Sequence, residues 1–252
     1  MCFDFETYNN IQPLIQQLVT MEAGITNAIS PSSIELQVFD NARLVFPNPS
    51  EERLFERLVD LDCFTDEYTF RSLLSGFGFK LFCYGNFGWA VDRSNPHELN
   101  FWYVPHDFDV LLDFEERDQY PHLTMTRISR QDKLSDGYGR PYLHAALPAY
   151  ANRVQTYHAR NNAVHSAPHL IQTLTQQYEA LEREVVGAIG LDYQENDTHH
   201  FPLPLARQLF DETARVFTEE VLVPFAASVG ATEIPVIQGP PTRPIRPATM
   251  FP

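Results

Sequence analysis

The sequence predicts an α+β fold in which an antiparallel sheet packs against helices. Large aromatic residues concentrate between residues 77 and 128, in short apolar segments separated by turn residues. Apolar residues on both sides of this stretch repeat at steps of three and four, as in amphipathic helices. The apolar segments lie too close together for crossover helices, so we expect an antiparallel β-meander over about 77–128.

The chain before the sheet is predicted to begin with a helix and a strand. Apolar residues at steps of three and four predict a helix over 9–29, which the serines and proline of 30–33 end. Ile34, Leu36 and Val38 then alternate with polar residues, and this alternation predicts a half-buried strand.

Two further helices are predicted before the sheet. Asn48 followed by Pro49 is typical of a cap and the first helical position. Thr65 is predicted to cap a second short helix, which Gly76 ends.

Five short segments are predicted as strands of the meander. Gly85 and Asn86 form a predicted two-residue hairpin turn, and further turns fall at 92–97, 105–107 and 116–121. The strand segments are FKLFCY (79–84), FGWAVD (87–92), LNFWYVP (99–105), FDVLLDF (108–114) and HLTMTRI (122–128).

The chain after the sheet is predicted to be helical. One helix bends at Pro148 and runs to about 160. The next runs from a cap at Ser166 to Gly190, and the last runs from Pro204 to about 230 with a kink near Pro224. Because a polar loop joins these last two helices, we expect them to form an antiparallel hairpin. The helix that ends at Gly190 carries a 3-4-3-4-3 apolar seam: Ile171, Leu174, Tyr178, Leu181, Val185 and Ala188.

The predicted organisation is one domain with an arm. Residues 1–230 form the α+β domain, with N-terminal helices and sheet in 1–130 and a helical part in 141–230. Residues 231–252 contain six prolines and form an extended arm that cannot make a core alone.

Composition sets the class of protein. No run of 18 apolar residues exists, and the N-terminus lacks the pattern of a signal peptide. Three widely spaced cysteines indicate reduced thiols, so we expect a cytoplasmic protein without a membrane partner. The net charge of −15 makes this an acidic protein and disfavours general binding to nucleic acid.

Charge is distributed unevenly along the chain. Residues 1–120 hold 20 acidic and 7 basic residues, a net charge of −13, whereas 127–160 holds 6 basic and 2 acidic residues, a net charge of +4. Only two of the 18 basic residues are lysines, and arginine suits interfaces better than lysine does. Charges of opposite sign could therefore meet across a head-to-tail contact between copies.

These features predict a structural or assembly subunit that contacts copies of itself, such as a viral capsid or connector (portal-like) component found in the virion. Other assembly proteins are a second class of partner, and the proline-rich arm is expected to lie on a neighbouring molecule. The predicted contact residues are arginines and tyrosines: Arg127, Arg130, Arg140, Arg153, Arg160, Tyr138, Tyr142, Arg243 and Arg246.

Two alternatives are open. FDFET at 3–7 resembles the first motif of the DEDD family of 3′–5′ exonucleases, which implies that Asp4 and Glu6 would share a strand face and hold metal ions. The resemblance covers five residues, and no later motif can be assigned. The basic stretch 127–160, with its interleaved tyrosines, would instead suit single-stranded RNA.

The other reactive side chains favour structural interpretations over catalytic or metal-binding ones. Three histidines, His158, His165 and His169, are more typical of a helix surface and a cap than of a metal site. Cys83 lies in an aromatic segment and is expected to be a buried, inert thiol. We therefore predict no catalytic set, no metal site and no cofactor, and the sequence leans away from an enzyme.

Overall fold

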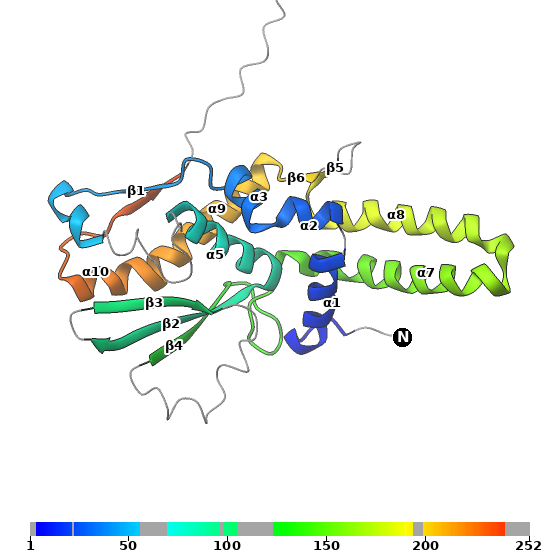
Figure 1. Ribbon diagram of the computed structural model, residues 1–252, viewed down its shortest axis with the longest axis horizontal. Helices are drawn as coiled ribbons and strands as arrows, with labels where there is room; N and C mark the ends of the chain where they lie inside the picture. Colours follow the sequence, from blue (N-terminus) through cyan, green and yellow to red (C-terminus); the bar gives the residue numbers. More distant parts are fainter. Residues whose placement is uncertain are drawn as a thin grey trace, which may run out of the picture.

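The computed structural model is an α+β fold. A helical body carries a small antiparallel sheet on one side and a long two-helix arm at one end (Figure 1). Within the described ranges, no helix combines the length and the apolar character needed to cross a membrane. The structure describes residues 4–21, 23–55, 70–95, 98–104, 123–193 and 199–239.

The first helical region confirms the prediction for residues 9–29. It consists of α1 (Tyr8–Met21) and α2 (Ala23–Ile29). Ile11, Ile15 and Leu18 are fully buried, as their spacing requires of the inner face of a helix.

The predicted strand around Ile34 is wrong. This segment is helix α3 (Pro31–Gln37), because Ser30 accepts a hydrogen bond from the backbone N–H of Ser33 at 3.3 Å and so caps a helix that begins with proline. Ile34 and Val38 are both buried. Their spacing of four fits a helix as well as the alternation fits a strand, and the cap decides between them.

The predicted helix start at Asn48 is confirmed as a tighter 3₁₀ helix, η1 (Pro49–Phe55). The Asn48 side chain accepts a hydrogen bond from the Ser50 backbone N–H at 3.2 Å. The prediction that Thr65 caps a helix falls within 56–69, outside the described residues.

The first part of the proline-rich arm pairs with its own chain. Strand β7 (Val236–Gln238) runs antiparallel to β1 (Arg43–Val45) as a two-stranded ribbon. Glu51 accepts hydrogen bonds from the backbone and side chain of Thr232 and so fastens the start of the arm to η1. The prediction that the arm lies on a neighbour is open only for 240–252, which the structure does not describe.

The largest correction concerns residues 79–84, which are helical. They close helix α5 (Phe70–Tyr84), whose buried residues include Leu74, Phe77 and Leu81 at helical spacing. Gly85 has φ +70° and ends this helix instead of making a hairpin turn. The aromatic residues suggest a strand, but the buried residues Leu74, Phe77 and Leu81 are spaced by three and four, which is the helical period.

Two glycines lie inside α5, and Gly76 does not end it. A Cβ atom at Gly78 would lie 2.6 Å from Cε2 of Phe39, so the missing side chain lets that ring pack directly on the helix backbone.

Three predicted strands are confirmed as a sheet with a different order. They are β2 (Asn86–Asn95), β3 (Glu98–Val104) and β4 (Leu123–Ser129). All pairs are antiparallel, but the order β3-β2-β4 puts β2 in the centre, so these strands do not follow the sequential order of a meander. The predicted strand 108–114 lies outside the described residues.

The helical hairpin is formed by a different pair of helices than predicted. Helix α7 (Leu147–Ser166) packs along α8 (Ile171–Ile189), whereas the last helices lie on the body (Figure 1). Pro148 lies in the first turn of α7 and does not bend it. The predicted end at Gly190 is confirmed, with φ +84°.

The last helix is irregular just before Pro224, where a kink is predicted. Helix α9 (Leu203–Phe217) passes into a π-helical turn, η4 (Thr218–Leu222), and then into α10 (Val223–Val229). Pro224 has no N–H to continue the helical ladder, which accounts for the irregular turn before it. The remaining short elements are η2 (Tyr142–Ala146), η3 (Pro168–Leu170), β5 (Asp192–Tyr193) and β6 (His199–His200).

Aromatic side chains from α5 and α9 fill the centre of the body. The ring of Phe77 lies 4.3 Å from that of Phe87 and 4.9 Å from that of Phe217, both edge-on. Phe82 packs between Tyr142 and Phe201. The sheet is therefore joined to the helices through β2 and α5.

Candidate functional site

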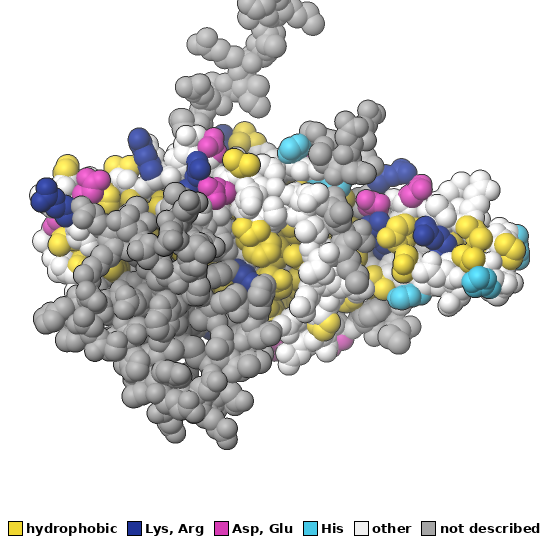
Figure 2. Space-filling model, viewed as in Figure 1, with side chains coloured by type: hydrophobic (Ala, Val, Ile, Leu, Met, Phe, Trp, Pro, Cys, Tyr) yellow, Lys and Arg dark blue, Asp and Glu magenta, His cyan; other side chains and the backbone are white. Residues whose placement is uncertain are grey.

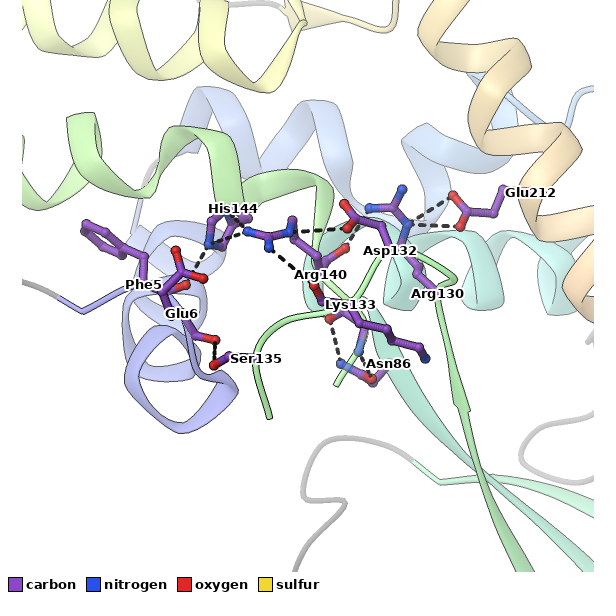
Figure 3. A network of polar contacts seen from close by, with 11 residues as sticks. Phe5, Glu6, Asn86, Arg130, Asp132, Lys133, Ser135, Arg140, His144 and Glu212 are labelled. Carbon is purple, nitrogen blue, oxygen red and sulfur yellow. Dashed lines mark hydrogen bonds and ion pairs between the residues drawn. The ribbon is translucent and has the colours of Figure 1, made fainter. Parts of the chain in front are cut away.

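A network of polar contacts joins the sheet, the helical body and the N-terminal segment (Figure 3). Its centre is Asn86, at the junction of α5 and β2. The Asn86 side-chain oxygen accepts hydrogen bonds from the Gly139 N–H and the Ser129 hydroxyl, both at 2.7 Å. Its amide group donates to the carbonyls of Gly139, at 3.1 Å, and Tyr84, at 2.9 Å. One side chain thus fixes the loop 130–141 against the start of the sheet.

The same contact requires two glycines. A Cβ atom at Gly139 would lie 2.2 Å from the carbonyl oxygen of Gly85 and 2.7 Å from the backbone nitrogen of Arg130. Arg130 in turn donates its backbone N–H to the Gly85 carbonyl at 2.9 Å. Only glycine leaves the two backbones room to approach this closely.

The ion pair with the least exposed side chains overall, among those of the described residues, lies beside this contact. The Arg130 guanidinium donates to both carboxylate oxygens of Glu212, at 3.0 and 3.1 Å, and stacks 3.7 Å from the ring centre of Tyr142. The Tyr142 hydroxyl donates to Glu212 at 2.7 Å. Burial, with Glu212 as acceptor, raises the pKa of this hydroxyl. The trio ties the loop to α9.

A second group holds the N-terminal segment. His144 contacts the Phe5 carbonyl through Nε2 at 2.7 Å, and Ser135 donates from its backbone N–H and its hydroxyl to the Glu6 carbonyl. The guanidinium of Arg140 lies between His144 and Asp132. These contacts strap the residues before α1 onto the loop.

Aromatic stacking completes the network. The rings of Tyr8 and Tyr138 stack with centres 4.8 Å apart, and the Arg127 guanidinium lies 4.2 Å above Tyr138. Desolvation, with the nearby charge of Arg127, lowers the pKa of Lys133. The carboxylates of Glu212 and Asp132 are used in ion pairs within the chain. We therefore interpret this network as a structural junction that fixes the loop.

The two-helix arm is held together by a smaller cluster. Arg153, which is 4% exposed, pairs with Glu182 at 3.0 Å and lies 4.1 Å above the ring of Tyr178. Arg160 extends over Tyr178 and Tyr157 at 5.5 and 5.9 Å. The arginines thus fasten α7 to α8.

The exposed surface of the arm is unusual in composition. Residues 154–178 hold a single residue among Asp, Glu, Lys and Arg, which is Arg160, and 137–178 is the longest stretch of the chain without an acidic residue. Exposed apolar side chains remain at Tyr157, Val164 and Leu170. In Figure 2 the outer half of the arm shows hydrophobic, basic and histidine side chains, with acidic ones nearer the body.

The structure does not place the exonuclease-like carboxylates on a strand. Asp4 accepts hydrogen bonds from the Glu6 backbone and the Asn10 amide, both at 2.9 Å, and so supports the turn that leads into α1. The predicted pairing of Asp4 and Glu6 on one strand face is therefore wrong.

The other reactive residues are dispersed. His158 and His165 lie on α7, whereas His169 lies in η3. Among the described residues, no three side chains of His, Cys, Asp or Glu converge as metal ligands. Cys83 is buried in α5, and burial raises the pKa of its thiol.

The predicted contact residues separate into groups. Arg130, Arg140 and Tyr142 lie together in the junction, and Arg153 forms an ion pair within the arm. Arg127 and Arg160 keep part of their surface exposed, while Arg243 and Arg246 lie outside the described residues. Glu212 and Asn86 were missed, because 82 residues separate Glu212 from Arg130 and no local pattern signals that pair.

No known protein family matches this sequence, and no curated protein matches it.

Proposed function

We propose that the chain is a structural assembly subunit that associates with copies of itself through the α7–α8 arm. The observation that carries the proposal is the composition of the arm's outer surface. Protein interfaces are depleted in Lys, Glu and Asp and enriched in Tyr and Arg, whereas a solvated helix usually carries many charges. The outer part of the arm shares the depletion in Lys, Glu and Asp although it projects from the body.

The charge distribution favours association at this place. Two copies that each carry −15 repel one another, and the repulsion is weakest where neither presents a carboxylate. The stretch 137–178 carries three arginines and no acidic residue. Two copies of the chain therefore approach one another most easily through their arms.

The kind of assembly is a prediction. One chain that repeats a single head-to-tail contact builds a closed ring or an open filament. A viral capsid or connector component is the class we propose, with the cytoplasm or the virion as its location and other assembly proteins as further partners.

The test is the mass of the full chain in solution, measured by sedimentation over a wide concentration range. We expect a mass above that of the 28.9 kDa monomer that rises with concentration. A monomer at every concentration would overturn the proposal.

A further inference from the structure

We infer that Arg127, near the end of β4, and Lys133, in the loop that follows it, form a binding site for the phosphate group of a small phosphate monoester. This inference is independent of the proposed assembly, because it concerns another part of the molecule.

The fold brings the two cations together on a fixed backbone. Arg127 lies in β4, where it is paired with Gly88 of the central strand. Lys133 is held by a β-bridge to Gly139, whose N–H donates to the Asn86 side chain at 2.7 Å. The junction therefore fixes the backbone on both sides of this pair.

The guanidinium of Arg127 is oriented, but its donors are unused. It lies 4.2 Å from the ring centre of Tyr138, which in turn stacks on Tyr8. Among the described residues, this exposed side chain makes no hydrogen bond and no ion pair. The residue opposite it in the sheet is Gly88, which has no side chain to cover it. A guanidinium presents its N–H donors as a planar fork, so this one is pre-oriented to bind an oxyanion.

The carboxylates of the loop are used elsewhere. Asp132 pairs with Arg140 at 3.4 Å, and Asp136 accepts the backbone N–H of Tyr8 at 2.6 Å. The side chain of Lys133 extends away from Arg140 (Figure 3) and forms no ion pair within the described part of the chain. Lys133 and Arg127 thus lie near one another without a carboxylate between them.

This arrangement is unfavourable while no anion is bound. Desolvation and the charge of Arg127 both lower the pKa of Lys133, and no acidic group opposes them. Carboxylates are plentiful in this chain, which has 33 acidic residues and 18 Lys and Arg residues. An anion that contacts both side chains would remove the repulsion, and perturbed groups of this kind concentrate at functional sites.

Charge and shape select a phosphate monoester. Such a group carries a charge of about −1.5 to −2 near neutral pH, which matches two cations, whereas a carboxylate or a phosphodiester carries a single charge. Two of its oxygens can accept from the guanidinium fork while a third contacts the ammonium group. Single-stranded RNA would need an aromatic face for its bases, but the ring of Tyr138 is already stacked with Tyr8 and Arg127.

The experiment measures the binding of inorganic phosphate and of a nucleoside monophosphate to the full chain by equilibrium dialysis at constant ionic strength. Arg127→Met and Lys133→Met each remove one cation and keep an unbranched side chain. Arg207→Met removes an exposed arginine of α9 and is the control. Circular dichroism and the unfolding midpoint establish that each variant is folded.

We expect one phosphate group per chain, and a dissociation constant at least about tenfold higher in Arg127→Met and in Lys133→Met, because each loses a charge-assisted contact. Arg207→Met should bind as the parent does, and Lys133→Arg should retain most of the affinity. A parent that shows no saturable binding, or an equal loss in Arg207→Met, would overturn the site.

Two further measurements separate this site from a general basic surface. Bound phosphate should raise the pKa of Lys133, which NMR can follow because the chain has only two lysines. An unchanged pKa at saturating phosphate would overturn the site. Single-stranded RNA without a terminal phosphate should bind more weakly than the monophosphate. Tighter binding of that RNA, lost in Arg127→Met, would overturn the monoester in favour of a nucleic-acid surface.

Discussion

Removing the carboxylate of Glu212 should lower the free energy of unfolding more than removing an exposed carboxylate that also pairs with an arginine. The side chains of Arg130 and Glu212 are 10% and 15% exposed, and the guanidinium meets both carboxylate oxygens. Glu212→Ala would leave a buried guanidinium without its partner and the Tyr142 hydroxyl without its acceptor. Breaking a buried pair in this way costs about 3–5 kcal/mol.

The assay is urea unfolding followed by circular dichroism at a fixed protein concentration. Glu219→Ala is the matched control, because the Arg215–Glu219 pair is similar in length but has side chains 34% and 55% exposed. Exposed pairs contribute about 0–1 kcal/mol. Replacing both partners, with Arg130→Met and Glu212→Leu, should recover much of the loss, because no charge is then left buried.

Equal costs for Glu212→Ala and Glu219→Ala would refute the reasoning. They would mean that the Arg130 guanidinium reaches water or another partner once its carboxylate is gone. The junction would then not depend on this pair.

Two further predictions concern the loop and the arm strand. Gly139→Ala should lower the unfolding midpoint severely, since the new Cβ atom would lie 2.2 Å from the Gly85 carbonyl oxygen. Gly137→Ala is the control, because a Cβ atom there would contact no other atom. Its positive φ of +82° should cost only about 1–2 kcal/mol. Hydrogen bonds from Thr232 lower the pKa of Glu51, so the anchoring they provide should be present above pH 4.5, the ordinary value, and lost as the pH falls below it. Hydrogen exchange of the β7 amides should become faster as this anchoring is lost, and Glu51→Gln should remove the pH dependence. Exchange as fast at neutral pH as at acidic pH would contradict the anchoring role of Glu51.

Local signals in the sequence predicted much of the helical framework. Gly190 and Gly230 end helices where the pattern places them, and both have positive φ. Pro49 begins a helical turn, and Pro224 follows a π-helical turn. Each depends on the backbone chemistry of one residue, and long-range contacts do not override it.

The wrong predictions arose where two periods fit the same residues. Ile34 and Val38 satisfy both an alternating strand and a helix, and the Ser30 cap selects the helix. In α5 the aromatic composition favoured a strand, although Phe77 and Leu81 lie at helical spacing. In such segments the period and the cap were better guides than composition.

The junction and the arm show the limit of sequence reasoning about sites. The prediction singled out Arg130 and Arg153 because arginine suits contacts between proteins, yet both are used within the chain. Their partners lie 82 and 29 residues away, beyond any local pattern. The acid-free stretch 137–178 was visible in the sequence, but only the structure shows that most of it forms a projecting arm.

The most direct measurement is the solution mass of the full chain at low and at high salt. Salt screens the repulsion between copies that each carry −15, while it leaves an uncharged helical contact unaffected. We therefore expect a larger mass at high salt. A mass that falls as salt rises would instead indicate a head-to-tail contact between opposite charges, and a constant monomer mass would contradict assembly altogether.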